Sequence, residues 1–276
     1  MPGETVDAAL EAAQRFAAQR LPTTFTYLGE NVANEAEADA VTRHYLEVLD
    51  RVAEAGLDTE ISVKLTHLGL DAGEDLARAN LERLARAATD RANWVWIDME
   101  ASRYVDGTLA VYRASLASFS DVGICLQAYL HRTDEDLSTL LPLMPSIRLV
   151  KGAYREPKAM AMTDRAEVAE SFHRLTLRML GERVQGQVRR IAVATHDVNL
   201  IERIEASAHG SGLSKGGFEI QMLYGIRQAD QFRFAEAGKP TRSLIAYGPA
   251  WYPWYMRRLA EKPSNVWFVL RNLFAR

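Results

Sequence analysis

The fold class is decided by residues 60–99, which read EISVKL at 60–65, EDLARANLERLARAATDRA at 74–92 and WVWIDM at 94–99. The first and last of these segments are short runs rich in β-branched and aromatic residues, which are typical of strands. The middle segment carries apolar residues at the spacing of one helix face. A strand, a helix and a second strand in this order predict a parallel βαβ unit.

The same unit recurs along the whole chain. Further strands are predicted at 23–28, 123–128, 147–151, 190–194, 218–222 and 241–246, and further helices at 34–54, 104–117, 134–141, 164–184, 196–207 and 228–237. Eight strands alternating with helices predict an α/β fold, a (β/α)8 TIM-like barrel. A doubly wound open sheet is the alternative. The regular spacing, and the lack of a Gly-x-Gly-x-x-Gly run after the first strand, favour the barrel.

The chain is expected to form a single catalytic domain over residues 1–276. A short N-terminal helix would occupy 1–21, with its periodic part at 5–20, the barrel 22–262, and a C-terminal helix 263–276, with its periodic part at 264–274. A length of 276 residues suits one large α/β barrel, and no break in composition marks a second domain.

Composition excludes several classes of function. The net charge of −3 gives no sign of a nucleic-acid partner, and the single cysteine, Cys125, excludes an internal disulfide and a cysteine-rich metal site. One cysteine fits a reducing compartment, so a cytoplasmic location is expected. We expect no signal peptide, and no apolar run is long enough to span a bilayer. Peripheral contact with the inner face of the cell membrane stays open.

Polar residues gather where the predicted strands end, which is where chemistry lies in a barrel. They are Glu30, Lys64, Asp98, Gln127, Arg148, Lys151, Thr195, His196, Asp197 and Tyr247, and Gly152 follows Lys151 directly. With the helix after the last strand included, the basic side chains Lys64, Arg148, Lys151, Arg257 and Arg258 outnumber the acidic Glu30, Asp98 and Glu261, which predicts an anionic ligand. Each residue also has a simpler interpretation: a strand-end Asp can be a helix cap, and Gly152 can serve only a turn with positive φ.

The segment 247–261 reads YGPAWYPWYMRRLAE and follows the last strand. It begins with a Gly-Pro turn signal, and Pro253 suits a first helical turn. Arg257 and Arg258 beside aromatics suggest a partly desolvated pocket for a small carboxylate, which arginine binds through two hydrogen bonds. Glu261 lies three residues after Arg258 and shares its helix face. The alternative is an amphipathic surface helix with one ion pair.

Six motifs resemble the proline dehydrogenase family in their order along the chain, and the resemblance extends from Tyr27 to Asn265. They are ISVKL at 61–65, IDME at 97–100, LQAY at 126–129, RLVKGAY at 148–154, ATHD at 194–197 and RRLAE at 257–261. The resemblance implies a distorted barrel with a final helix over the mouth, and a non-covalent FAD. It also implies oxidation of L-proline to Δ1-pyrroline-5-carboxylate, the first step of proline catabolism to glutamate. Electrons would pass to a membrane quinone. The chain lacks the DNA-binding and aldehyde-dehydrogenase modules of bifunctional relatives, so a monofunctional enzyme is expected.

The resemblance also implies roles for individual residues. Lys64, Arg257 and Arg258 would bind the proline carboxylate, Asp98 would orient the substrate, and Arg148 would act beside the flavin. The walls of the proline site would be Tyr154, Leu223 and Tyr247, with Glu261 near the amine. The flavin contacts would be Met99, Gln127, Val150, Lys151, Gly152, Ala153, Thr195 and His196. Glu30 and Arg257 would form a gate. Where the family has a tyrosine one turn before the arginines, this chain has Trp254, or Tyr255 in a shifted register.

Two other kinds of barrel remain as alternatives. A Schiff-base enzyme of the aldolase type would use Lys64 or Lys151 as its nucleophile. A non-catalytic barrel would bind an amino acid or a partner. A metal-dependent hydrolase is disfavoured, and no metal is expected, because among the six histidines only His67 and His196 fall at strand ends.

Overall fold

The fold is a closed barrel of eight parallel strands. The computed structural model describes residues 1–211, 217–252 and 256. The strands pair in the order in which they follow one another, and β8 closes the barrel against β1. They are β1 (Thr23–Tyr27), β2 (Thr59–Lys64), β3 (Val95–Asp98), β4 (Val122–Gln127), β5 (Ser146–Val150), β6 (Arg190–Ala194), β7 (Glu219–Leu223) and β8 (Thr241–Tyr247). The predicted barrel is therefore confirmed.

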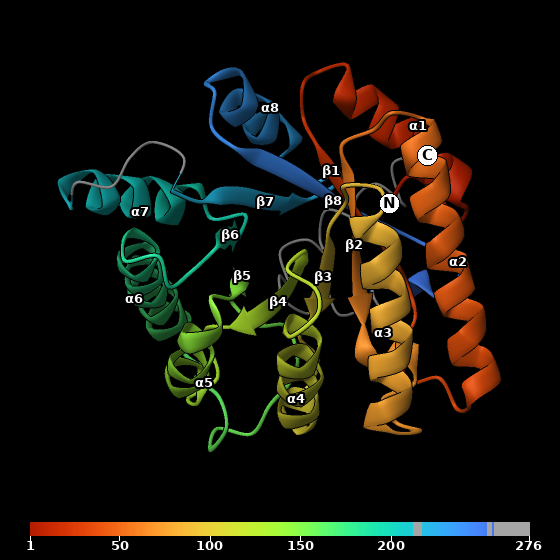
Figure 1. The fold of residues 1–276 in the computed structure, drawn as a ribbon. Coiled ribbons are helices and arrows are strands. Elements are labelled where there is room, and N and C mark those ends of the chain that lie inside the picture. The colour runs from red at the N-terminus through yellow and green to blue at the C-terminus, as the bar shows by residue number, and fades with distance from the viewer. Residues whose placement is uncertain (212–216, 253–255, 257–276) are drawn as a thin grey trace, which may run out of the picture.

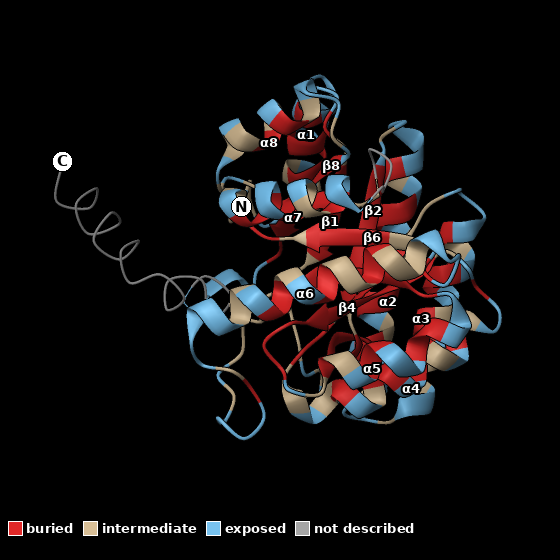
Figure 2. Ribbon diagram, turned by 90° about the vertical axis from the view of Figure 1, so that its left-hand side faces the viewer, coloured by how far each residue is buried: buried red, intermediate tan, exposed pale blue. Residues whose placement is uncertain are grey.

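Helices surround this barrel (Figure 1). They are α1 (Val6–Ala17), α2 (Glu35–Glu54), α3 (Glu74–Thr89), α4 (Val105–Leu116), α5 (Thr133–Leu140), α6 (Arg165–Val184), α7 (Val198–Gly210) and α8 (Gln228–Glu236). Short 3-10 helices occupy Leu65–Leu68, Ser102–Tyr104 and Leu141–Leu143. Figure 2 shows the strands buried at the centre and the outer faces of the helices exposed. The apolar stripe of each helix thus supplies the core between helix and strand.

Several helices begin at the residue types that favour helix starts. The side chain of Asn34 accepts a hydrogen bond from the Glu37 N–H at the start of α2, and Asp164 does the same for two N–H groups of α6. At α7 the cap is Asp197, which accepts from the Leu200 N–H. Such caps satisfy N–H groups that have no partner within the helix. Asp197 is therefore both a mouth residue and a helix cap.

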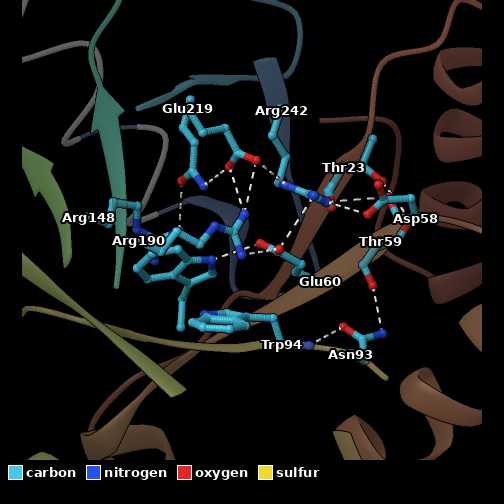
Figure 3. A network of polar contacts seen from close by, with 12 residues as sticks. Thr23, Asp58, Thr59, Glu60, Asn93, Trp94, Arg148, Arg190, Glu219 and Arg242 are labelled. Atoms are coloured by element: carbon cyan, nitrogen blue, oxygen red, sulfur yellow. Dashed lines mark hydrogen bonds and ion pairs between the residues drawn. The ribbon is translucent and has the colours of Figure 1, made fainter. Parts of the chain in front are cut away.

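The strands point alternate side chains into the barrel and out towards the helices. At the end of the barrel where the strands begin, the interior is charged rather than apolar (Figure 3). Arg190 lies between Glu60 and Glu219, and Arg242 contacts the same two carboxylates and Asp58. We call these five residues the basal network. It lies at the end of the barrel where the strands begin. The opposite end, where the strands finish, is the mouth.

Most predicted boundaries agree with the structure within about two residues. The largest differences, of three residues, are at helix ends: α1 ends at Ala17 rather than Arg20, α3 at Thr89 rather than Ala92, and α7 at Gly210 rather than Ser207. The predicted helix at 264–274 lies outside the described residues, and so does most of the segment that carries the paired arginines. Within the described ranges, no helix has the length and apolar character needed to cross a bilayer.

Candidate functional site

Lys64 and Asp98 end neighbouring strands at the mouth. They are register partners on β2 and β3, and the Lys64 Nζ lies 3.9 Å from Asp98 Oδ2. The two side chains are 11% and 21% exposed, so the ammonium group is largely withdrawn from water but still accessible. Both residues point into the barrel, because they alternate with the outward-facing Val63 and Ile97. Asp98 therefore lies beside Lys64, as the resemblance implied.

Arg148 places a second cation against the same carboxylate. Its side chain is 2% exposed, and Nη2 donates to Asp98 Oδ1 at 2.5 Å and to the Ser62 hydroxyl oxygen at 2.5 Å. Its guanidinium carbon lies 5.0 Å from the centre of the Trp96 ring. A buried guanidinium requires such partners, because an unpaired charge in a low-dielectric interior is costly. Asp98 thus faces two cations with one negative charge, which leaves this part of the mouth electropositive.

Gln127 places a buried side-chain amide at the end of β4. Its Nε2 donates to the Met99 carbonyl at 3.3 Å, while its Oε1 has no hydrogen-bond partner among the described residues. Leaving a buried acceptor unsatisfied costs about 1–3 kcal/mol, so a ligand donor that reaches it gains that energy. The imide N–H of an isoalloxazine ring is such a donor. This amide therefore fits a flavin.

The loop after β5 needs glycine at its centre. Gly152 has φ +119°, and a Cβ there would lie 2.2 Å from the Tyr129 ring. Just before it, the Lys151 Nζ contacts Asp197 Oδ2 at 2.8 Å, so the loops after β5 and β6 are tied together. Val150 and Ala153 lie on either side of this Lys-Gly pair. The backbone here can approach a flat ligand closely because no side chain intervenes.

Thr195 and His196 form the loop after β6. The Thr195 hydroxyl oxygen accepts from the Asp197 N–H at 3.2 Å, and His196 Nε2 accepts from the Leu223 N–H at 3.4 Å. A neutral His196 that accepts through Nε2 carries its proton on Nδ1. The structure thereby links the ends of β6 and β7 beside the Lys151 loop.

Glu30 and Tyr154 meet across the mouth. The Tyr154 hydroxyl donates to Glu30 Oε2 at 3.3 Å, although the two residues come from the loops after β1 and β5. Glu30 is thus near the barrel entrance, as predicted. The other half of the predicted gate, Arg257, lies outside the described residues, and so do Arg258 and Glu261.

Tyr247 is placed differently from the prediction. Its side chain is fully buried, and its hydroxyl lies 2.8 Å from Nε2 of His44, a residue of α2. Burial raises the pKa of this phenol far above its usual range. Ile245 and Tyr247 point towards the helices, whereas Arg242 of the same strand points into the barrel. The structure therefore does not bring Tyr247 next to Lys64, Asp98 and Arg148. Leu223 ends β7 half-buried, on the inward-facing side of that strand.

Four polar or aromatic residues around Lys64, Asp98 and Arg148 were not predicted as site residues: Ser62, Trp96, Glu100 and Gln221. Ser62 precedes Lys64 by two positions and Trp96 precedes Asp98 by two, so a strand period of two would have placed both inside the barrel. Glu100 lies in a quoted motif, and burial raises the pKa of its carboxyl. Its two oxygens accept from Thr66, which in turn accepts from the Asn31 N–H beside Glu30.

The alternative sites receive less support from the geometry. Lys64 and Lys151 are each beside a carboxylate, whereas a nucleophilic lysine needs an apolar pocket or a neighbouring cation. No group of three or more metal-ligating side chains was found in the described part of the chain. A cavity of about 490 Å³ lies at the basal end, next to Asp58, Glu60 and Trp94, and one of about 480 Å³ lies between α4 and α5. Neither is at the mouth, where the strand-end polar groups converge.

Comparison with known proteins gives a consistent result. The family model described as "Proline dehydrogenase" matches residues 9–271. "Proline dehydrogenase 1" of Bacillus subtilis subsp. natto is 37% identical, over 98% of this chain and 88% of the relative. "Proline dehydrogenase" of Deinococcus radiodurans is 33% identical, over 98% of this chain and 87% of the relative.

Solved structures with the same fold belong to much longer chains. Proline utilization A from Bdellovibrio bacteriovorus, inactivated by N-propargylglycine, has a TM-score of 0.87 and 24% identity, over 100% of this chain and 33% of that chain. Proline utilization A from Corynebacterium freiburgense has a TM-score of 0.77 and 21% identity, over 94% of this chain and 30% of that one. This chain spans about a third of those proteins. At such identity the likeness shows the barrel fold alone.

Proposed function

Because this chain belongs to the proline dehydrogenase family, we propose that it oxidises L-proline to Δ1-pyrroline-5-carboxylate at the mouth of its barrel. The cofactor in this proposal is a non-covalent FAD. The observation that carries it is the arrangement of Lys64 and Arg148 around the single carboxylate of Asp98. This arrangement leaves excess positive charge for an anionic substrate at the end of the barrel where parallel barrels carry their chemistry.

Lys64 would bind the carboxylate of proline, with Arg257 and Arg258 as further partners. The side chain of Lys64 is mostly buried, so the contact would form in a poorly hydrated setting where it is stronger than in water. Asp98 would fix the position of the ammonium group and so orient the substrate. Tyr154 and Leu223 would wall the proline ring, and the contact of Tyr154 with Glu30 supports this role. Tyr247, which points towards α2, is not among the proposed walls.

The chemical demand on these residues is alignment rather than acid–base catalysis. A bound flavin supplies the acceptor for the hydride that leaves C5 of proline. The side chains hold the ring at the required distance and angle, because near-attack geometry accounts for much of what a protein adds to such a step. Arg148 would place a fixed positive charge where negative charge accumulates. No protein nucleophile is required.

Contacts to the flavin are proposed for the residues at the ends of β3 to β6. They are Met99, Gln127, Val150, Lys151, Gly152, Ala153, Thr195 and His196. Two observations support this proposal: within the described ranges the Gln127 oxygen has no hydrogen-bond partner, and Gly152 leaves the backbone open to close approach. The proposal has three further parts. Electrons would pass from the flavin to a membrane quinone, and the protein would contact the cytoplasmic face of the membrane peripherally. The reaction would be the first step in the catabolism of proline to glutamate.

An anaerobic spectrum tests the function most directly. Purified protein should be yellow, and L-proline added without oxygen should bleach the flavin absorption. A carboxylate ring analogue, tetrahydrofuroic acid, should inhibit competitively with proline. Protein that binds no flavin, or flavin that proline does not bleach, would exclude the proposal. Borohydride trapping of substrate on Lys64 or Lys151 would instead support the Schiff-base alternative.

A further inference from the structure

Gln221 occupies the barrel interior between the mouth and the basal network. It lies on β7, is 3% exposed, and its Oε1 accepts from Arg148 Nη1 at 3.3 Å. Its Nε2 donates to Glu219 Oε1 at 2.7 Å. One amide therefore joins the buried guanidinium at the mouth to a carboxylate of the basal network.

The chemistry of the two neighbours fixes which way this amide faces. An ionised carboxylate only accepts hydrogen bonds, and a guanidinium only donates them. With Glu219 on one side and Arg148 on the other, only one amide orientation satisfies both partners. The reversed orientation would place two acceptors together and two donors together.

Glu219 is itself held in place, so the orientation does not drift. Arg190 Nη2 donates to both of its oxygens, at 3.1 and 2.9 Å, and Arg242 Nε donates to Oε2 at 3.3 Å. Desolvation opposes the charged form, but the two arginines outweigh it and lower the pKa of Glu219. Glu219 therefore stays ionised and keeps its role as acceptor.

Arg148 needs a contact of this kind. Its hydrogen bonds to Asp98 and Ser62 both use Nη2, and the Trp96 ring supports the flat face of the guanidinium without defining its rotation in that plane. The contact between Nη1 and Gln221 lies on the other branch of the guanidinium. Gln221 therefore holds the branch of the guanidinium that Asp98 and Ser62 do not contact.

We propose that Gln221 is a positioning residue, which holds the Arg148 guanidinium in the orientation that stabilises the negative charge taken up in the mouth during the reaction. This inference rests on the proposed function, because Arg148 acts there on a bound flavin. Gln221 does not touch the substrate. Its effect reaches the reaction through Arg148 alone.

The test is the midpoint potential of the bound flavin in Gln221→Met, compared with wild type. Loss of a hydrogen bond to a charged group should weaken the preference for the reduced cofactor about tenfold, which lowers the potential by about 30 mV for a two-electron couple. Gln221→Asn, which is one methylene too short to reach both partners, should shift the potential in the same direction. It serves as the second variant if Gln221→Met does not fold.

Gln231→Met is the matched control. Gln231 is also a fully buried glutamine, but its amide donates to the carbonyls of Leu223 and Ile226 and not to Arg148. It should lower the unfolding temperature without moving the potential. A crystal structure of Gln221→Met should show the Arg148 guanidinium rotated from its wild-type orientation, and this readout does not depend on the flavin.

The outcomes separate the two proposals. A wild-type protein that binds no flavin would remove the proposed function, while an unmoved Arg148 in the Gln221→Met crystal structure would overturn the positioning role. A flavin that L-proline reduces, with the same potential in wild type and both Gln221 variants, would overturn the positioning role and leave the function standing. An equal shift in Gln231→Met would also overturn it, because the effect would then be a general consequence of core damage.

Discussion

At the scale of single residues, Asp98 decides the electrostatics of the mouth. It is the shared partner of Lys64 and Arg148, and only the arginine makes close contact with it, at 2.5 Å against 3.9 Å for the lysine. The carboxylate therefore neutralises Arg148 more fully than Lys64. This difference leaves the ammonium group as the more available partner for an incoming anion.

Lys64→Met should raise the KM for L-proline by orders of magnitude, with a smaller effect on kcat. A buried charge-assisted contact is worth about 2–5 kcal/mol, and methionine keeps the length of the side chain without the charge. Steady-state kinetics with a quinone analogue would measure both constants. Lys239→Met is a suitable control, because Lys239 pairs with Glu205 at the opposite end of the barrel. A KM equal to that of wild type would rule out the role of Lys64 in carboxylate binding.

The sequence revealed the charged members of the site but not their uncharged supports. Lys64, Asp98 and Arg148 were predictable because a charge at the end of an apolar strand is conspicuous. Ser62 and Gln221 were not, because neutral polar residues in a strand have many structural uses. The orientation of Tyr247 was missed for a different reason. It depends on the contact between the Tyr247 hydroxyl and the imidazole of His44 on α2, which joins residues far apart in the sequence.

At the scale of elements, an ion pair and hydrogen bonds tie the loops after the strands to one another. The loop after β5 turns at Gly152 and is tied to the β6 loop through Lys151 and Asp197. The loop after β1 is held by Asn31, whose N–H donates to Thr66 and whose side chain donates to Asp71 and Tyr104. The strands and helices were predictable from the spacing of apolar residues along the sequence. The contacts between loops were not, since they join residues far apart in the sequence.

Gly152→Ala should both destabilise the protein and weaken flavin retention. Strain at a positive φ costs about 1–3 kcal/mol, and the added Cβ must also displace the Tyr129 ring from 2.2 Å. Thermal unfolding and the flavin-to-protein absorbance ratio would show the two effects. Gly186→Ala carries similar strain, at φ +76°, but its Cβ would meet nothing within 4 Å. It should lower the unfolding temperature and keep the flavin. Equal flavin loss in both variants would contradict a local role for the loop.

At the scale of the whole molecule, stability depends on charges buried inside the barrel. Arg242→Met should cost about 3–5 kcal/mol of unfolding free energy, because it leaves Glu60 and Glu219 with one buried cation fewer. Chemical denaturation would measure the loss. Arg203→Met removes a surface pair with Glu170 and should have no measurable effect. A similarly small effect for Arg242→Met would mean that water enters the basal network.

The stability should also fall in mild acid because of a buried histidine. Burial, and then the neighbouring Lys64 ammonium, lower the pKa of His67 to about 4. Since the unfolded chain takes up the proton near pH 6.5, stability from this residue is complete above that pH. It declines as the pH falls towards 4, by up to about 3 kcal/mol in total. In His67→Phe the unfolding free energy should vary less over this range. Parallel profiles for His67→Phe and wild type would disprove the assignment.

The basal network also has a consequence for how the chain folds. Asp58 and Arg242 contact each other although 184 positions separate them, and Glu60 also pairs with Arg242, which lies on the last strand. A half-formed barrel emerging from the ribosome would hold Glu60 without the second of its two arginine partners. Water must therefore stay inside until β8 arrives, and drying of the interior should be the last, slowest event of refolding.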